Sequence, residues 1–220
     1  MSAKTVAVMA GTLVDTQMGV DFLRARNSSL EILSYPVSRN PREQNAFQLG
    51  AMEEKVFTVR ALVRDAVAKG AKALLVHCNS LSGALAFGSL CAEEGIGLVT
   101  PLMVHRRVAQ ASGRIGLIAA NNQSLHGIEQ VMFDANPNCD VLGVSLLPMV
   151  VAIEQRTPPA GIAGAFGLSH LLRYFEACKV DRVVLGCTHF PYMAGELRRL
   201  TGLEIFNPDD MMYEMLTALL

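Results

Sequence analysis

The sequence predicts an α/β protein of two pseudo-symmetric, three-layer α/β domains with mainly parallel sheets. Short apolar runs alternate with longer helical patterns, which is typical of parallel sheets covered by helices on both faces. Several of these runs recur at one constant separation, about half of the chain. Two cysteines, Cys78 and Cys187, lie at equivalent points of this repeat. We therefore expect the active site in the cleft between the two domains.

Eight apolar runs are predicted to be strands. They lie near residues 5–10, 30–35, 73–77, 97–100, 115–119, 141–145, 182–186 and 203–206. Some of them have counterparts 109 positions later in the chain. The pairs are 6–10 with 115–119, 32–35 with 141–144, and Cys78 with Cys187. Because one shift relates strands and cysteines alike, we interpret the repeat as two related domains.

Helical patterns fill the intervals between the strands. The longest runs from Glu43 to Lys69 and ends at Gly70, a residue typical of helix C-termini. The others are predicted at 16–26, 81–94, 102–112, 122–135, 162–178, 190–200 and 208–220. Because Thr100-Pro101 breaks the chain after a strand, we place the first domain at 1–100 and the second at 101–206. Periodicity does not assign the last helix, and we expect 207–220 to join the first domain.

Composition excludes several classes of function. The 220-residue chain is 51% hydrophobic with a net charge of −1, so it offers no basic surface for nucleic acid. Its apolar runs are shorter than the roughly 20 residues that span a bilayer, and its first strand begins too early for a signal peptide. Five cysteines outside any disulfide-scaffold spacing indicate reduced thiols. We expect a cytoplasmic protein without nucleic-acid or membrane partners, and a homodimer by base rate.

Cys78 and Cys187 each follow a strand-like run and precede a helical stretch. Ligands of parallel sheets bind beyond the carboxyl ends of the strands, where both cysteines lie. A thiol at the start of a helix faces the positive end of the helix dipole, which favours the reactive thiolate. Asn79, Ser80 and Thr188 add donors beside the sulfurs, and backbone N–H groups there can hold a substrate carboxylate.

The other three cysteines lack this setting. Cys91, Cys139 and Cys178 are interpreted as small buried hydrophobes. His77 precedes Cys78 on a strand, so we expect it to point to the opposite face. The cysteine pair has no further Cys or His at close ligand spacing, and we therefore predict no metal site.

At these residues the sequence resembles the aspartate/glutamate racemase superfamily, whose members do not use pyridoxal phosphate. Cys78-Asn79-Ser80 is similar to the family's Cys-Asn-Thr/Ser element. Residues 186–191, Gly-Cys-Thr-His-Phe-Pro, are similar to its Gly-Cys-Thr-His-aromatic-Pro element. Residues 148–154 are similar to a segment that ends in a glutamate near the second cysteine. The resemblance covers essentially the whole chain.

The resemblance implies an isomerase, a cofactor-independent racemase of an acidic amino acid (aspartate and/or glutamate). Its implied mechanism uses two bases, with Cys78 and Cys187 on opposite faces of a small-molecule substrate. One cysteine removes the α-proton as a thiolate, and the other gives a proton as a thiol. His189 and Glu154 are expected to form a relay that supports Cys187. No cofactor is expected, because preorganised donors can stabilise the carbanion-like transition state.

The chain departs from the family pattern after two of its strands. Gly11-Thr12 stands where glutamate racemases have Asp-Ser-Gly, and it still offers a backbone N–H and a hydroxyl to a substrate carboxylate. Asn121, in the place of a common family threonine, is also expected to bind substrate. Arg39 and Arg42 are candidates to contact a side-chain carboxylate, and solvated surface charges are the alternative reading.

Other functions stay open. Relatives in the superfamily isomerise maleate, racemise hydantoins or decarboxylate malonates, and Cys78 counts against the last because decarboxylation uses a single cysteine. A non-catalytic amino-acid-binding protein on the same scaffold is a further alternative. A Cys/His hydrolase using Cys187 and His189 is less favoured. Residues two apart on one segment are expected to form a poor pair, and Cys78 would have no role.

Overall fold

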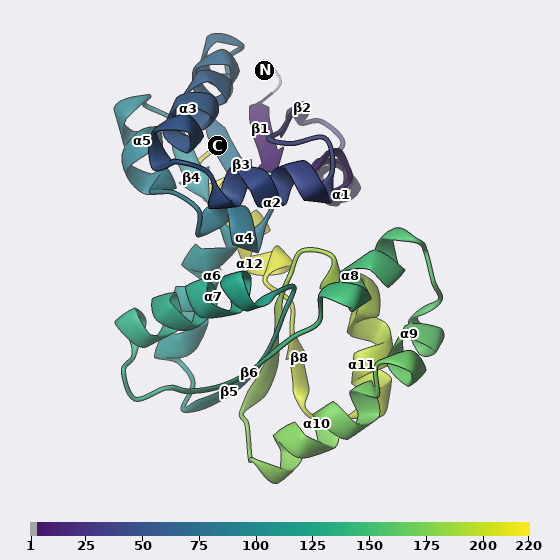
Figure 1. Cartoon of the computed structure of the whole chain (residues 1–220). Helices are drawn as coiled ribbons and strands as arrows, with labels where there is room; N and C mark the ends of the chain where they lie inside the picture. The colour runs from purple at the N-terminus through teal and green to yellow at the C-terminus, as the bar shows by residue number, and fades with distance from the viewer. Residues whose placement is uncertain (1–3) are drawn as a thin grey trace. The chain divides into compact units, whose positions relative to one another are not determined.

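The computed structural model describes residues 4–220, which form two compact units. Unit 1 comprises the chain up to Pro101 together with Asp210–Leu220, and unit 2 comprises Leu102–Asp209. In Figure 1 the colour of unit 1 runs from purple to teal and returns as yellow at the C-terminus. Each unit holds one four-stranded sheet in which all strand pairs are parallel. The predicted fold class, α/β with parallel sheets, is confirmed.

The sheet of unit 1 has the strand order β2-β1-β3-β4. Its strands are β1 (Thr5–Ala10), β2 (Glu31–Pro36), β3 (Ala73–Val76) and β4 (Gly97–Val99). Its helices are α1 (Leu13–Arg26), α2 (Pro41–Leu49), α3 (Met52–Ala68), α4 (Asn79–Ser82), α5 (Phe87–Glu93) and α12 (Asp209–Ala218). The central strands β1 and β3 are buried at every position, which is why the sequence shows them as unbroken apolar runs.

Helices cover both faces of this sheet. On one face, Val59 and Val63 of α3 and Leu90 of α5 share a buried core with Met9 of β1. On the other face, α1 lies so close to β1 that a Cβ added at Gly19 would be 2.7 Å from a methyl carbon of Val8. Glycine at this position therefore sets the distance between α1 and the sheet.

The C-terminal helix α12 packs on α1. The Arg26 guanidinium lies 4.2 Å from the centroid of the Phe22 ring and 5.8 Å from that of Tyr213, and Arg26 forms an ion pair with Asp210. Phe22 and Tyr213 meet edge to face with their centroids 6.5 Å apart. One cation between two rings thus ties the end of the chain to an early helix.

The sheet of unit 2 repeats the arrangement with the order β6-β5-β7-β8. Its strands are β5 (Arg114–Ala119), β6 (Asp140–Ser145), β7 (Arg182–Gly186) and β8 (Glu204–Phe206). Its helices are α6 (Pro101–Gln110), α7 (Asn122–Ala135), α8 (Leu147–Glu154), α9 (Pro159–Ala165), α10 (Leu168–Ala177), the 3₁₀ helix η1 (Phe190–Met193) and α11 (Ala194–Leu200). The first residues of β1 and β5, Thr5 and Arg114, are 109 positions apart, so the sequence repeat is a structural repeat.

Unit 2 is also layered. On one face, Phe175 and Leu172 of α10 share a buried core with Val183 and Leu185 of β7. On the other face, α7 approaches β7, since a Cβ added at Gly186 would lie 2.9 Å from the terminal carbon of Ile128. Each sheet therefore lies between two helical layers, as the three-layer prediction states.

All eight predicted strands are confirmed to within two residues, but several helices differ. The helix predicted from Glu43 to Lys69 is two helices, α2 and α3, because Gly50 and Ala51 adopt extended backbone conformations. The helix predicted at 162–178 is divided at Gly167, which has a positive φ of 59°. Similarly, the predicted helix 81–94 covers only the end of α4 before it contains α5, and the predicted helix 190–200 begins as the 3₁₀ helix η1. Among the described residues, no helix has the length and apolar character needed to cross a membrane.

Helix α8 is not among the helices predicted from the sequence. Its residues Leu147–Glu154 are apolar in nearly every position, so they lack the polar positions that reveal a helical period. A proline lies in its first turn. Backbone N–H groups there have no intrahelical acceptor, so the N–H that proline lacks costs no helical hydrogen bond.

The three cysteines predicted to be buried hydrophobes differ in their surroundings. Burial raises the pKa of Cys91 to about 11. The pKa of Cys139 is raised by burial and by the nearby carboxylates of Asp181 and Asp140. Both therefore stay protonated at neutral pH, whereas Cys178 is only partly buried. The prediction is correct for two of the three.

We expect Gly116→Ala to destabilise the protein. Gly116 in β5 faces the buried Phe175 ring, and an added Cβ would lie 2.9 Å from a ring carbon. Overpacking of this kind lowers the free energy of unfolding by about 1–3 kcal/mol. Gly127→Ala in α7 is the matched control, because its Cβ would meet no atom within 4 Å, and it should be neutral or stabilising by up to ~1 kcal/mol. Urea denaturation followed by circular dichroism measures both, and equal effects would contradict the packing.

We expect His105 to make stability depend on pH. His105 is fully buried in α6, and burial lowers its pKa from 6.5 to about 3. Because the folded state disfavours the protonated ring, its contribution is complete above pH 6.5 and is lost as pH falls toward 3. This group should cost the wild type about 2 kcal/mol between pH 7 and 4.5.

The test is urea denaturation of His105→Gln at these two pH values. The variant should lose less stability on acidification than the wild type. His170→Gln, at an exposed histidine, should keep the wild-type difference. A His105→Gln profile parallel to the wild type would show that the buried ring is not responsible.

Candidate active site

The cysteines lie at the switch points of the two sheets. In unit 1 the chain passes from β1 to β2 on one side, while β3 lies on the other side of β1. Met9 of β1 is opposite Val76 of β3, so the carboxyl ends of these strands meet at one edge. Unit 2 has the same arrangement, with Ala119 of β5 opposite Gly186 of β7. Open α/β sheets bind ligands at such points.

Cys78 follows β3 and is the N-cap residue of α4. Its carbonyl oxygen accepts hydrogen bonds from the backbone N–H and the hydroxyl of Ser82, which fixes the cysteine at the helix start. Its side chain is buried, with Sγ 3.4 Å from the Ser80 Oγ, 3.7 Å from the Gln44 Nε2 and 3.9 Å from the Asp15 Oδ2. Three polar groups from three helices thus surround one sulfur.

Asp15 reaches this sulfur from the first turn of α1. Thr12 is the N-cap of α1, and its Oγ1 accepts a hydrogen bond of 3.2 Å from the Asp15 backbone N–H. The Asp15 carboxylate is buried and accepts the Cys78 S–H. Thr12, predicted to bind substrate, therefore also caps α1, which uses one of the two lone pairs of its hydroxyl oxygen.

Two glutamines of α2 complete the surroundings of Cys78. The amide of Gln44 donates to Ser80 Oγ at 3.4 Å, and that of Gln48 donates to the same oxygen at 2.9 Å. Gln44 lies directly over Gly11, where an added Cβ would be 1.9 Å from its Nε2. A side chain at position 11 would therefore displace the Gln44 amide from its present position.

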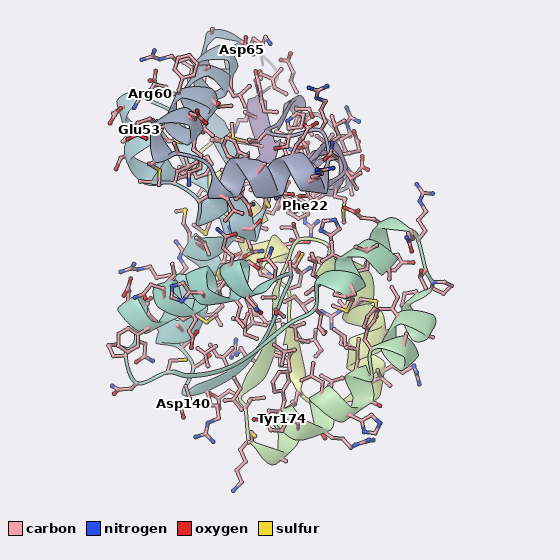
Figure 2. All side chains as sticks on the ribbon, in the orientation of Figure 1. Phe22, Glu53, Arg60, Asp65, Asp140 and Tyr174 are labelled. Carbon is pink, nitrogen blue, oxygen red and sulfur yellow. The ribbon has the colours of Figure 1, made fainter. Side chains whose placement is uncertain are left out.

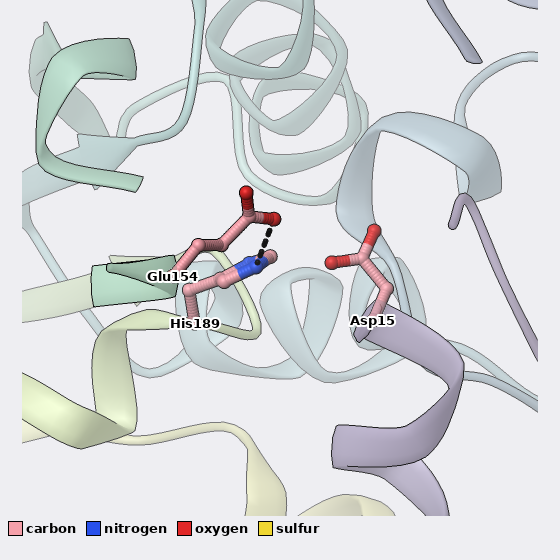
Figure 3. Close-up of side chains that lie close together, drawn as sticks. All are labelled: Asp15, Glu154 and His189. Atoms are coloured by element: carbon pink, nitrogen blue, oxygen red, sulfur yellow. Dashed lines mark hydrogen bonds and ion pairs between the residues drawn. The ribbon is translucent and has the colours of Figure 1, made fainter. Parts of the chain in front are cut away.

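Cys187 has a different set of partners. Its Sγ lies 3.6 Å from the Nδ1 of His189, and the Nε2 of that ring lies 3.3 Å from the Glu154 Oε1, the bond drawn in Figure 3. The carboxylate accepts the Nε2–H, so Nδ1 faces the sulfur as an acceptor in the neutral ring and as a donor in the imidazolium. The contacts expected for the predicted relay of Glu154, His189 and Cys187 are present in unit 2.

The close contact of Cys187 and His189 corrects the expectation that residues two apart form a poor pair. That expectation assumes an extended chain, but β7 ends at Gly186 and the chain turns. The Phe190 N–H donates to the Cys187 carbonyl at 3.0 Å, and His189 has a helical backbone (φ −80°, ψ −26°). The turn brings the imidazole back over the sulfur.

The two half-sites correspond position by position. Ser80 and His189, each two residues after its cysteine, are 109 positions apart in the chain. The outer partners come from α2 and α8, the helices that follow β2 and β6. Cys78 is thus joined to neutral groups and one carboxylate, whereas Cys187 is joined to an imidazole and a carboxylate.

The other predicted site residues lie in several settings. Asn79 and Thr188 are buried next to their cysteines. Asn121 caps α7, where its Oδ1 accepts from the Ser124 backbone N–H at 2.8 Å. Arg39 and Arg42 are exposed. Arg39 forms an ion pair with Glu43 one helical turn further on, so neither arginine lies among the described contacts of Cys78.

Sequence reasoning missed Asp15, Gln44 and Gln48. Asp15 stands three residues after the capping Thr12, a spacing that marks a first-turn acidic residue. Gln44 and Gln48 are four apart on one helix and so share a face. These signals give the local face of each side chain, and only the fold shows that the faces point to Cys78.

No protein-family model matches the chain. In sequence it is similar to the glutamate racemase of Corynebacterium kroppenstedtii, with 28% identity over 149 residues that cover 64% of this chain and 50% of that protein. It is 31% identical to the glutamate racemase of Beutenbergia cavernae over 143 residues, covering 62% and 48%. The chain spans about half the length of the curated relatives it matches.

Solved structures share the fold. A glutamate racemase from Francisella tularensis in complex with D-glutamate superimposes with a TM-score of 0.72 at 17% identity, covering 100% of this chain and 81% of that one. The aspartate racemase of Picrophilus torridus gives 0.69 at 13% identity, covering 99% and 94%. An allantoin racemase from Klebsiella pneumoniae gives 0.67 at 17% identity, covering 98% and 89%.

The relatives found by sequence and the structures found by fold are all named as racemases. They confirm the resemblance of this chain to the aspartate/glutamate racemase superfamily.

Proposed function

We propose that the protein is a cofactor-independent racemase of an acidic amino acid, aspartate and/or glutamate. The observation that carries this proposal is the pair of buried thiols, Cys78 and Cys187, at equivalent switch points. Each thiol has its own proton-transfer partners within its unit. The sequence likeness to glutamate racemases supports the substrate class.

The proposed reaction uses one cysteine on each face of the α-carbon. The thiolate of one takes the α-proton, and the electron pair stays on carbon and its carboxylate. The thiol of the other then delivers its proton to the opposite face, which inverts the configuration. The thiol and thiolate have exchanged places at the end, so the enzyme is poised for the reverse reaction. No redox step and no cofactor are needed.

The local contacts support these proton transfers. His189 can accept the Cys187 proton at Nδ1 while Glu154 stabilises the imidazolium, so a thiolate can form there. Ser80 and Gln44 can donate hydrogen bonds to a Cys78 thiolate. For substrate binding we propose the backbone N–H groups at Gly11 and at the start of α4, with Asn79 and Thr188 as side-chain donors.

We further propose a cytoplasmic homodimer that takes a small molecule as its substrate. The five thiols support a reducing compartment. The homodimer rests on the general frequency of two-fold assemblies.

The test is proton NMR of the purified protein in D₂O without added cofactor. L-aspartate, D-aspartate, L-glutamate and D-glutamate are incubated separately, and chiral chromatography follows the enantiomers. Loss of the α-proton signal together with appearance of the opposite enantiomer is expected for at least one pair. Absence of exchange with all four would sink the proposal and turn the search to maleate, hydantoins, malonates or a binding role.

Replacement of either proposed base should abolish racemisation while leaving α-proton exchange for one enantiomer only. We expect Cys78→Ser and Cys187→Ser each to lower racemisation at least about 100-fold, since a serine alkoxide forms far less readily than a thiolate. Each variant should still exchange the α-proton of the one enantiomer that faces the remaining thiol. The two variants should therefore incorporate solvent deuterium at the α-carbon of opposite enantiomers.

Cys178→Ser is the matched control, because this partly buried cysteine precedes β7 whereas Cys187 follows the carboxyl end of that strand. It should retain wild-type racemisation. Full racemisation by either Cys78→Ser or Cys187→Ser would contradict the two-base assignment.

The Cys187–His189–Glu154 relay also favours a second candidate, a thiol hydrolase. Its nucleophile would be Cys187, with His189 as the base. A stoichiometric burst of p-nitrophenol from an activated ester, retained in Cys78→Ser and lost in Cys187→Ser, would support this candidate over the racemase.

A further inference from the structure

The polar network that α2 places over Cys78 extends beyond the single Gln44 donor named in the proposed function. Gln44 contacts both the Cys78 sulfur and the Ser80 hydroxyl, and Gln48 contacts the same hydroxyl. Gln48 is buried, and its backbone carbonyl accepts a hydrogen bond of 3.2 Å from the buried Lys55 ammonium. A buried lysine therefore holds the C-terminal part of α2 in place.

The glutamines fix the direction of the Ser80 hydroxyl. A serine hydroxyl has one hydrogen to donate and two lone pairs to accept with. The amides of Gln44 and Gln48 both donate to Ser80 Oγ and so use both lone pairs. The hydroxyl hydrogen is then directed to the remaining neighbour, the Cys78 Sγ at 3.4 Å.

A thiolate at Cys78 needs such donors because its charged neighbour opposes it. The titratable group that faces the sulfur within unit 1 is Asp15, 3.9 Å away on α1, and its carboxylate repels a second negative charge. The groups that α2 contributes are neutral amides, and the nearby Glu43 is paired with Arg39 instead. The side chains of α2 can therefore offset this repulsion by donating hydrogen bonds towards the thiolate.

We propose that Gln44 and Gln48 are the thiolate-stabilising device of Cys78. Gln44 donates directly to the sulfur, and Gln48 is a positioning residue that acts through Ser80. The device is the neutral counterpart of the His189–Glu154 relay, built from the equivalent helix of the repeat. In the half-site of Cys78, hydrogen-bond donation from α2 and Ser80 therefore stabilises the thiolate. The inference rests on the proposed role of Cys78 as a proton acceptor.

The experiment measures the Cys78 pKa directly, without substrate. Thiolate absorbance at 240 nm is titrated for the wild type and for Cys78→Ser, and the difference isolates this one thiol. The same titration is then made for Gln44→Leu and for the double variant Gln44→Leu/Cys78→Ser, and their difference gives the Cys78 thiol without the Gln44 amide. Because loss of a donor to a charged group is worth about one power of ten in the ionisation constant, the Cys78 pKa should rise by about 1. Gln48→Leu should raise it less.

The matched control is Gln17→Leu, the same substitution at an exposed glutamine whose amide donates to Asp21. It should leave the Cys78 pKa unchanged. Gly11→Ala provides a second route, because its Cβ would collide with the Gln44 amide and displace it while Gln44 remains in the sequence. It should raise the Cys78 pKa as Gln44→Leu does.

An unchanged Cys78 pKa in both Gln44→Leu and Gly11→Ala overturns the inference, as does an equal rise in Gln17→Leu. Circular dichroism and a cooperative unfolding transition establish that each variant is folded. Failure of the racemase proposal would appear separately, as absence of α-proton exchange in a wild type whose Cys78 pKa still depends on Gln44.

Discussion

The pairing of the two central strands in each sheet is the constraint on which both half-sites depend. Met9 opposite Val76 in unit 1, and Ala119 opposite Gly186 in unit 2, bring two carboxyl ends to one edge. The connections that leave these strands diverge, so the edge is left to the residues that follow the strands. A slip of one residue in either pairing would turn the side chains of the slipped strand to the opposite faces of the sheet and displace the cysteine that follows it.

The same scaffold surrounds two equivalent cysteines with different side chains. In each unit the residue two positions after the cysteine contacts the sulfur, and the helix after the second strand contacts that residue or the sulfur itself. Serine, glutamines and the Asp15 carboxylate surround Cys78, whereas a histidine bonded to a glutamate contacts Cys187. A repeat that keeps its geometry while changing side chains thus places different hydrogen-bonding groups around two equivalent sulfurs.

Close packing keeps these contacts in register. Gly11 leaves room for the Gln44 amide beside Cys78, whereas glycine lets α1 approach β1 at Gly19 and lets α10 lie against β5 at Gly116. Side chains that act together must be held close to one geometry, and rigid helices on a sheet meet that demand better than loops. Gly11 therefore acts within the surroundings of Cys78, and the other two glycines act through the packing of their helices.

The sequence by itself determined the strands, the repeat and the two cysteines. Central parallel strands are buried on both faces, so β1, β3, β5 and β7 appear as apolar runs that a single chain reveals. The helix breaks at Gly50 and Gly167 were not predicted, because a glycine within a helical pattern can adopt either helical or non-helical backbone angles.

Only the tertiary structure decided the partners of the sulfurs. Asp15 and Gln44 reach Cys78 across 63 and 34 positions of sequence, and Glu154 reaches His189 across 35. No periodic pattern encodes such distances, since they follow from how whole helices pack on a sheet. Even the contact between Cys187 and His189, which are two positions apart, depends on the turn after β7. Side chains two positions apart converge in such a turn and stay apart on an extended chain.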